Sequence, residues 1–143
     1  MAILTTTLGA FPKPDYVPVL DWFQSEAGPD AAVPTEAYED AMRDMGDEAE
    51  EIFARAARDV LADQEAAGID IPTDGEVRRE NYIHGFCRSM SGIDFKNREE
   101  KVSRNGTYAC KCHKIVSELV TNCENSHCKT EWLFSNKIAK QYN

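Results

Sequence analysis

The sequence lacks a run of about 20 apolar residues, so it offers no candidate for a membrane-spanning helix. Its first residues also lack a basic region followed by a long apolar segment, the pattern typical of a secretory signal. From these two absences we expect a cytoplasmic protein whose thiols are reduced. Basic residues are few, with 16 Lys and Arg against 25 Asp and Glu and a net charge of −9, which argues against a nucleic-acid surface as the main function.

Length sets a further limit on the fold. The chain has 143 residues, which is enough for one modest domain. A complete eight-fold β/α barrel needs roughly 250 residues, so the chain is too short to form one. The apolar content of 42% and the charged content of 29% are ordinary for a globular protein.

Composition changes sharply near residue 95. Residues 1–95 hold 20 acidic and 7 basic residues, whereas residues 96–143 hold 5 acidic and 9 basic ones. Fourteen of the sixteen alanines precede residue 69, and four of the five cysteines follow residue 109. This contrast fits an acidic helical half followed by a loop-rich half. It also fits a composite or interrupted reading frame.

The first third of the chain predicts one strand and two helices. Residues 3–8 are rich in apolar and β-branched side chains and precede a glycine, which predicts a strand. Apolar residues recur at helical spacing from Tyr16 to Phe23 and predict a helix there. A shorter helix is expected over 35–45, with Pro34 suited to its first turn.

The middle of the chain predicts a helix followed by a buried strand. Residues 47–50 resemble a capping box, and an apolar stripe then runs from Ile52 to Ala67 at spacings of three and four. Gly68 stands where a helix-ending glycine belongs, and the apolar run 69–71 predicts a strand. Together with the strand at 3–8, this order predicts a parallel α/β architecture.

The remaining segments give weaker patterns. An apolar stripe over 82–90 predicts a helix that the chain leaves at 92–95. Residues 107–120 alternate poorly and fit either a hairpin or an excursion from a barrel. A final helix is expected to begin with Thr130 as its N-cap and to reach Tyr142.

Charged groups gather directly after the strand predicted at 69–71. Asp74, Gly75 and Glu76 follow that strand, and two arginines come next. Carboxylates and arginines at the carboxyl end of a strand, before a helix, are where α/β enzymes place their chemistry. Taken alone, the tripeptide 74–76 is also a common solvated turn.

Residues 5–14 (Thr-Thr-Thr-Leu-Gly-Ala-Phe-Pro-Lys-Pro) and 64–82 resemble cobalamin-independent methionine synthase. The likeness is to its C-terminal catalytic barrel or to shorter single-barrel relatives. It is strong over 3–106 and thin in the Cys-rich tail, 107–143. The resemblance implies an α/β fold in which 1–143 form a single incomplete domain, a partial TIM (β/α)8 barrel of the first two to three βα units.

The resemblance also implies a reaction and its substrates. In the family, a methyl group passes from 5-methyltetrahydrofolate to the thiol of homocysteine. A zinc ion activates the thiol, because metal coordination lowers a thiol's pKa and yields a thiolate at neutral pH. A related enzyme with another thiol acceptor is the alternative that the resemblance leaves open.

The resemblance assigns substrate-binding roles to two segments. The backbone of Leu8, Gly9 and Ala10 is expected to line the amino-acid substrate, with Ala10 standing where a serine is usual, so that a hydroxyl contact is lost. Glu76 matches the glutamate that binds substrate, and its carboxylate can accept charge-assisted hydrogen bonds from an ammonium group. Supporting roles are expected for Asp74, Arg79 and Asn81.

The zinc ligands of the family have no match in the chain. They are a His-x-Cys pair, a glutamate and a distant cysteine, and the sequence contains no His-x-Cys. The pair His84 and Cys87 has the wrong spacing and falls on a predicted helix. The resemblance therefore places the metal beyond this chain, identifies no catalytic residue in it, and implies that the isolated chain is inactive and needs the rest of the barrel. We also expect the isolated chain to be oligomeric, partly disordered or aggregation-prone, because open sheet edges invite pairing.

A second metal hypothesis rests on the tail. Six potential ligands occur there within 19 residues: Cys110, Cys112, His113, Cys123, His127 and Cys128. Zinc would suit such ligands, but the spacings match no standard zinc motif. Incidental free thiols are the favoured interpretation, and a small zinc-binding or partner-binding module is the alternative.

Overall fold

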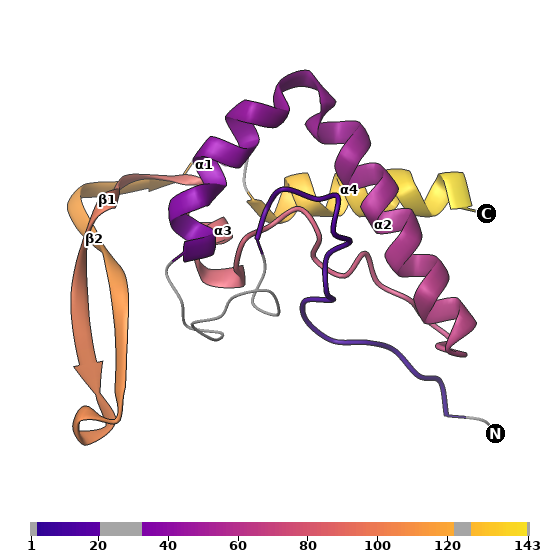
Figure 1. Cartoon of the computed structure of the whole chain (residues 1–143), viewed down its shortest axis with the longest axis horizontal. Helices are drawn as coiled ribbons and strands as arrows, with labels where there is room; N and C mark the ends of the chain where they lie inside the picture. Colours follow the sequence, from indigo (N-terminus) through magenta and orange to yellow (C-terminus); the bar gives the residue numbers. More distant parts are fainter. Residues whose placement is uncertain (1–2, 21–32, 122–126, 143) are drawn as a thin grey trace.

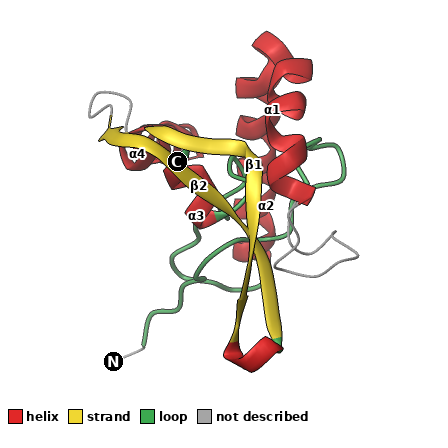
Figure 2. Cartoon of the chain, turned by 90° about the vertical axis from the view of Figure 1, so that its left-hand side faces the viewer, coloured by secondary structure: helices red, strands yellow, loops and turns green. Residues whose placement is uncertain are grey.

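The computed structural model describes residues 3–20, 33–121 and 127–142. The order of elements is α1 (Val33–Met45), a 3-10 turn (Gly46–Glu48), α2 (Ala49–Ala66), α3 (Tyr82–Cys87), β1 (Met90–Ser103), a 3-10 turn (Arg104–Gly106), β2 (Tyr108–Thr121) and α4 (His127–Tyr142). The helices and the N-terminal segment form one body, from which the β1–β2 hairpin projects (Figures 1 and 2). Within the described ranges, no helix is long and apolar enough to cross a membrane.

The core of the body lies along α2. The apolar stripe predicted from the sequence is buried there. It packs against the N-terminal segment, the segment that follows the strand predicted at 69–71, and α4. Its most buried side chains are Val17, Val19, Phe53, Ala56, Ala57, Val60, Val77 and Ile138. An amphipathic helix with acidic residues on its outer face thus organises the molecule, as its spacing predicts.

The C-terminus of α2 agrees with the sequence prediction, whereas its N-terminus does not. At its C-terminus, Gly68 has φ +80°, its N–H donates to the carbonyl of Glu65 (2.9 Å), and the N–H of Ile69 donates to that of Gln64 (3.0 Å). This is a Schellman motif, and the predicted helix-ending glycine is confirmed. The predicted capping box is wrong, because Asp47 lies inside the preceding 3-10 turn and the described side chain of Glu48, the N-cap, makes no capping bond.

The two predicted strands meet through a single parallel bridge, Thr6 to Ile71. The N–H of Ile71 donates to the carbonyl of Thr5 (3.0 Å), and the Asp70 carboxylate accepts from the N–H and the hydroxyl of Thr5 (2.8 Å each). The predicted parallel neighbourhood is therefore present, but neither segment forms a regular strand. In the described part of the chain, each of these two segments pairs only with the other. Most of its backbone N–H and carbonyl groups therefore make no hydrogen bond of a sheet.

Residues 15–20 form a turn and extended chain where the sequence predicts a helix, so that prediction is wrong. Pro18 explains the difference, since it removes a helical donor and disfavours helical geometry at Val17. The alternate residues Val17 and Val19 are buried instead, at 4% and 1% exposure. The rest of the predicted helix, including Phe23, lies outside the described residues.

The second half of the chain corrects three boundaries. α3 ends at Cys87, so the helix predicted over 82–90 is too long, and the predicted exit at 92–95 lies inside β1. Residues 107–120 belong largely to β2, which confirms the hairpin alternative. α4 begins at His127, so Thr130 is an interior residue and not the N-cap.

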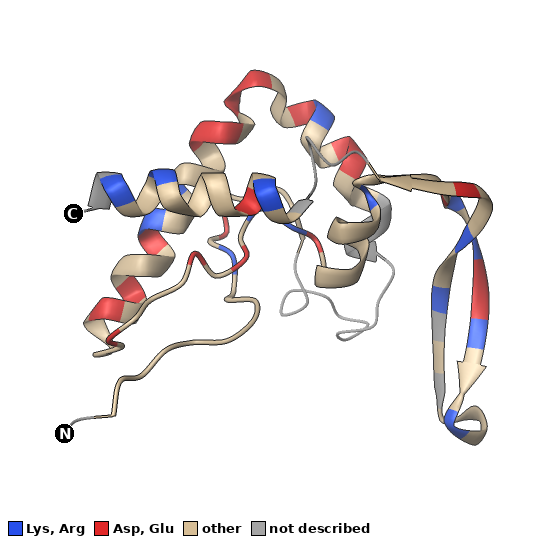
Figure 3. Ribbon diagram, turned by 180° about the vertical axis from the view of Figure 1, so that it is seen from behind, with Lys and Arg blue, Asp and Glu red and all other residues tan. Residues whose placement is uncertain are grey.

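The hairpin is antiparallel and irregular. Its register runs evenly from Glu99–Cys112 to Ser103–Tyr108 and shifts twice nearer the body. In Figure 3, the charged residues of α1 and α2 are mainly acidic, those of α4 are mainly basic, and the hairpin carries both signs. The change of composition near residue 95 thus coincides with the start of the hairpin.

Candidate functional site

The turn at 74–81 is the centre of the candidate site. Gly75 and Glu76 have φ of +64° and +56°, and the Glu76 N–H donates to the Asp74 carboxylate (3.1 Å). The N–H of Phe11 donates to the carbonyl of Gly75 (2.9 Å), which ties the first motif to the second. A Cβ on Gly75 would lie 2.6 Å from Cβ of Phe11 and 2.7 Å from Cγ1 of Val60. Only glycine fits there, and Glu76 is held in a conformation that non-glycine residues seldom adopt.

Gln64 joins the two motifs from inside the body. It is buried on α2, and its Nε2 donates to the carbonyls of Val60 (3.1 Å) and Thr73 (2.8 Å). Its Oε1 accepts from the N–H of Thr73 (3.0 Å) and the hydroxyl of Thr7 (2.6 Å). The sequence places Gln64 in the apolar stripe, but its hydrogen bonds depend on three segments meeting and are invisible in the spacing.

Two arginines and three glutamates form a network beside the turn. Arg79 contacts the carboxylate of Glu76 through Nη2 at 2.7 Å, and its Nε lies 3.9 Å from Oε2 of Glu131 on α4. Arg78 donates to Glu50 of α2 (2.7 Å), and its Nε lies 3.8 Å from Oε1 of Glu131. Burial raises the pKa of Glu131, against the lowering effect of the two guanidinium groups.

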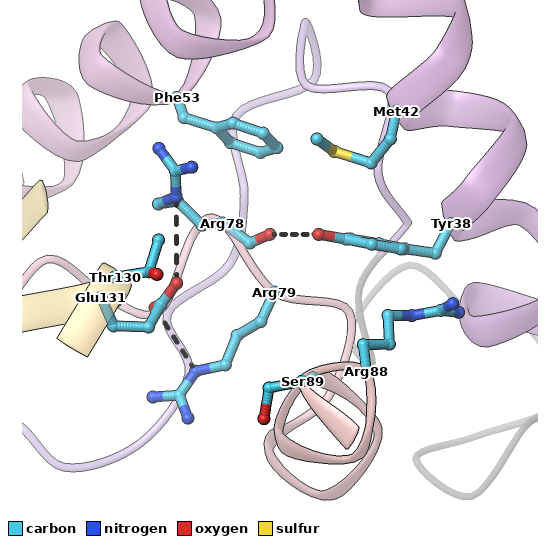
Figure 4. Close-up of a pocket in the computed structure, with 10 residues that line it drawn as sticks. Tyr38, Met42, Phe53, Arg78, Arg79, Arg88, Ser89, Thr130 and Glu131 are labelled. Carbon is cyan, nitrogen blue, oxygen red and sulfur yellow. Dashed lines mark hydrogen bonds and ion pairs between the residues drawn. The ribbon is translucent and has the colours of Figure 1, made fainter. Parts of the chain in front are cut away.

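Of these side chains, Arg78, Arg79 and Glu131 line a cavity of about 200 Å³ between α1, α3, α4 and the turn. In Figure 4, Arg78, Arg79 and Glu131 lie on one side of it and Tyr38 and Met42 of α1 on the other. The Tyr38 hydroxyl donates to the carbonyl of Arg78 (3.5 Å), and burial raises the pKa of Tyr38. The turn and α4 therefore contribute charged side chains to the cavity, and on the side of α1 the guanidinium of Arg88 lies over the ring of Tyr38.

The residues predicted to support the site make structural bonds. Asp74 is hydrogen-bonded to the hydroxyl of Ser135 on α4, which also lies 3.0 Å from the carbonyl of Glu131. The Asn81 side chain caps α3 by accepting from the N–H of Ile83 (2.7 Å) and, more weakly, of His84 (3.3 Å). Glu131 and Ser135 are not among the residues predicted from the sequence. Their spacing of four residues marks one helical face, and that was the available signal.

The expected backbone contact segment is open. Leu8 is fully exposed, and Gly9 has φ +80°. In the part of the chain that the structure describes, no atom lies within 4 Å of a Cβ built on Gly9. Ala10 is half-buried, one residue before the hydrogen bond from Phe11 to the turn. A ligand can thus approach the backbone closely at Gly9.

The two tail cysteines whose side chains the structure describes lie on different elements. Cys112 is half-buried on β2, and Cys128 is exposed on α4. Cys110 lies on β2 without a described side chain, and Cys123 lies outside the described residues. Over 3–20, 33–121 and 127–142, no group of three or more His, Cys, Asp or Glu side chains is placed to hold a metal ion.

Comparisons with known proteins agree on one family. The family described as cobalamin-independent synthase, catalytic domain, matches residues 3–136. Methionine synthases of Sulfolobus acidocaldarius and Sulfurisphaera tokodaii are 32% and 30% identical over 91 residues, 64% of this chain and 22% of each relative. The chain thus spans less than a quarter of the length of these curated relatives.

A solved structure is similar as well. It is a B12-independent methionine synthase from Shewanella sp. W3-18-1 in complex with selenomethionine. The TM-score is 0.55 and the identity 26%, over 82% of this chain and 30% of the other. The likeness therefore extends over most of the chain's fold as well as its sequence.

Proposed function

The chain belongs to the cobalamin-independent synthase catalytic-domain family, and we propose that it supplies part of the amino-acid pocket of a methionine-forming methyltransferase. The reaction transfers a methyl group from 5-methyltetrahydrofolate to the thiol of homocysteine. Support comes from the family match over residues 3–136 and from the methionine synthases that resemble the chain.

The observation that carries this proposal is the meeting of the two motifs. The hydrogen bond from Phe11 to Gly75 and the bonds of Gln64 hold the open backbone at Gly9 and the carboxylate of Glu76 on one connected framework. A free amino acid carries an ammonium group for such a carboxylate and a carboxylate for exposed backbone N–H groups. The selenomethionine bound to the Shewanella enzyme is a ligand of this class.

We propose further that the body is the start of a TIM barrel. The parallel bridge between Thr6 and Ile71, with α2 as the crossover, has the connectivity of a first βα unit and the strand after it. Ile3, Leu8 and Ile71 are exposed at 91%, 100% and 52%, as expected for strands whose neighbours are further barrel strands. The rest of the barrel would cover them.

The zinc ion of the family does not fit the described residues. They place no group of three potential ligands together, and His84 and Cys87 lie on a short helix beside the hairpin. Burial also raises the pKa of Cys87, which disfavours the thiolate that binds metal. Our proposal therefore gives this chain the binding of the amino acid and no step at the metal.

Calorimetric titration of the full chain with L-methionine tests the proposal. We expect binding that Glu76→Gln weakens about tenfold or more, because a charge-assisted hydrogen bond contributes about 1.5–3 kcal/mol. Glu100→Gln makes the same chemical change at an exposed position on the hairpin and should leave the affinity unchanged. Methionine binding that is indifferent to Glu76, or no binding at millimolar ligand, would refute the proposed site.

A further inference from the structure

Arg79 stands between two carboxylates on different elements. Its Nη2 lies 2.7 Å from Glu76 in the turn, and its Nε lies 3.9 Å from Glu131 on α4. All three side chains are between 18% and 23% exposed, so solvent screens their charges only partly. Among the described residues, Nε of Arg79 has no hydrogen-bond acceptor. Arg79 therefore forms an ion pair at hydrogen-bond distance with Glu76, whereas its contact with Glu131 is longer than a hydrogen bond.

The ion pair between Arg79 and Glu76 conflicts with the binding of an ammonium group at the proposed site. An ammonium group that binds Glu76 brings a second cation to a carboxylate already neutralised by Arg79. Two like charges beside one carboxylate repel each other, and a half-buried guanidinium that loses its anion is strongly disfavoured. Arg79 thus needs another anion whenever the ammonium group is bound.

We propose that Glu131 is a positioning residue. When an ammonium group binds to Glu76, the guanidinium of Arg79 moves from Glu76 to Glu131. This inference rests on the proposed amino-acid site. A shift of about 1 Å at Nε would bring the 3.9 Å separation to hydrogen-bond length. Because the guanidinium is a fork with donors on several edges, Arg79 can turn from one carboxylate to the other without leaving its place.

The surroundings of Glu131 suit this role. α4 is held on the body by the buried side chains Phe134 and Ile138 and by the bond from Ser135 to Asp74, so Glu131 is fixed relative to the turn. Burial raises the pKa of Glu131, which means that the two long contacts leave its charge incompletely compensated. A closer approach of Arg79 would supply the missing compensation.

Glu50 provides a matched control. Like Glu131, Glu50 lies on a helix and forms an ion pair with an arginine. Its partner, however, is Arg78, at 2.7 Å, and not Arg79. If any glutamate that anchors the turn mattered equally, Glu50→Gln and Glu131→Gln would have the same effect on ligand binding. The inference requires that only Glu131→Gln has an effect.

The test is a double-mutant cycle on L-methionine affinity in the full chain. We expect Glu131→Gln to weaken binding about fivefold, the size of a partly screened ion pair, and Glu131→Asp to restore part of the loss. In the Arg79→Gln background, where no guanidinium has to be moved, Glu131→Gln should have no effect. A purely structural role for Glu131 would give the same loss in both backgrounds.

The outcomes separate the two proposals. If Glu76→Gln abolishes binding but Glu131→Gln leaves it unchanged, or weakens it equally without Arg79, the inference is overturned and the proposed function stands. If wild-type chain shows no binding that depends on Glu76, both are overturned.

Should Glu131→Gln fail to fold, the wild-type chain still gives an answer. The arginine Nε–H signal of Arg79, followed by 1H–15N correlation spectra, should shift on addition of L-methionine as a hydrogen bond to Glu131 forms. The Nε–H signal of Arg58, which lies on α2 and contacts Glu51, serves as the internal reference. An Arg79 signal that does not move while methionine binds would contradict the inference.

Discussion

The body around α2 encloses a continuous apolar core, whereas none of the described side chains of the β1–β2 hairpin is buried. In the body, Gln64 and Glu80 are 1% exposed, and the bonds of Gln64 and the ion pair of Glu80 with Arg88 offset their burial. On the hairpin, Ile115 and Val116 are exposed at 68% and 62%. Apolar content alone therefore does not decide where the chain packs.

The contrast concerns spacing and long-range contacts. The apolar residues of α2 recur on one helical face and meet segments from both ends of the chain. Those of β2 stand side by side in a ribbon of two strands, which has no second layer among the described residues to cover either face. We infer that the free energy of unfolding resides almost wholly in the body.

The largest expected effect is the loss of a core aromatic ring. Phe53, which is 1% exposed, lies at the centre of the body, and Phe53→Ala should lower the free energy of unfolding by about 4 kcal/mol. Ile115→Ala on the hairpin should change it by less than about 0.5 kcal/mol. Urea titration followed by circular dichroism measures both. Equal losses would show that the hairpin is part of the cooperative unit and would remove the contrast.

A smaller difference is expected between two glycines with positive φ. Gly75→Ala should cost about 3 kcal/mol, because the left-handed backbone penalty adds to the overlap with Phe11 and Val60. Gly106, in the hairpin turn, has φ +87° and no described atom within 4 Å of a built Cβ. Gly106→Ala should therefore cost only about 1 kcal/mol. A Gly75 variant as stable as the Gly106 variant would mean that the turn relaxes freely, and it would weaken the case for a rigid site.

The parts that the sequence predicts well are those fixed by local spacing. α2 and its terminal Gly68 follow from an uninterrupted stripe and one glycine, and the contact of 3–8 with 69–71 follows from the order strand, helix, strand. The helix predicted over 82–90 is present but ends at Cys87, and Tyr82, Ile83 and Phe86, whose spacing imitates a buried stripe, are 55%, 51% and 43% exposed.

The missed parts depend on residues far apart in the chain. Ser135 reaches Asp74 across 61 positions, and Glu131 meets Arg79 only because α4 docks on α2. Nothing in the spacing of the tail predicts where that helix packs. Asp74, Glu76 and Arg79 could be proposed as site residues because they follow a predicted strand in one short segment, whereas their partners on α4 required the tertiary fold.

The buried polar link between the motifs should contribute less than the core ring. Gln64→Met keeps the volume but leaves the N–H and carbonyl of Thr73 without their Gln64 partner and removes one of the two hydrogen bonds of the Thr7 hydroxyl, so we expect a loss of about 2 kcal/mol. Asp63→Met introduces the same side chain one residue earlier, at an exposed position, and should cost less than about 0.5 kcal/mol. Denaturant titration of the pair decides the matter, and equal stabilities would mean that the body does not need this link.

The smallest effect concerns His113, where the hairpin touches the body. Its ring lies 4.5 Å from that of His84 on α3 and 4.3 Å from that of Phe95 on β1, and burial, reinforced by His84, Arg98 and Arg88, lowers its pKa to about 4. The folded-state pKa of His113 lies below the ordinary value near 6.5. The packing of the neutral His113 ring therefore stabilises the fold above pH 6.5, and this contribution is lost as the pH falls towards 4. An NMR titration of the imidazole signals should therefore show His113 protonating well below pH 6, and His113→Gln should flatten the pH dependence of stability between these two values. If His113 titrates near 6.5 instead, the base of the hairpin is as solvated as its tip, and the boundary between the two regions lies at Arg88.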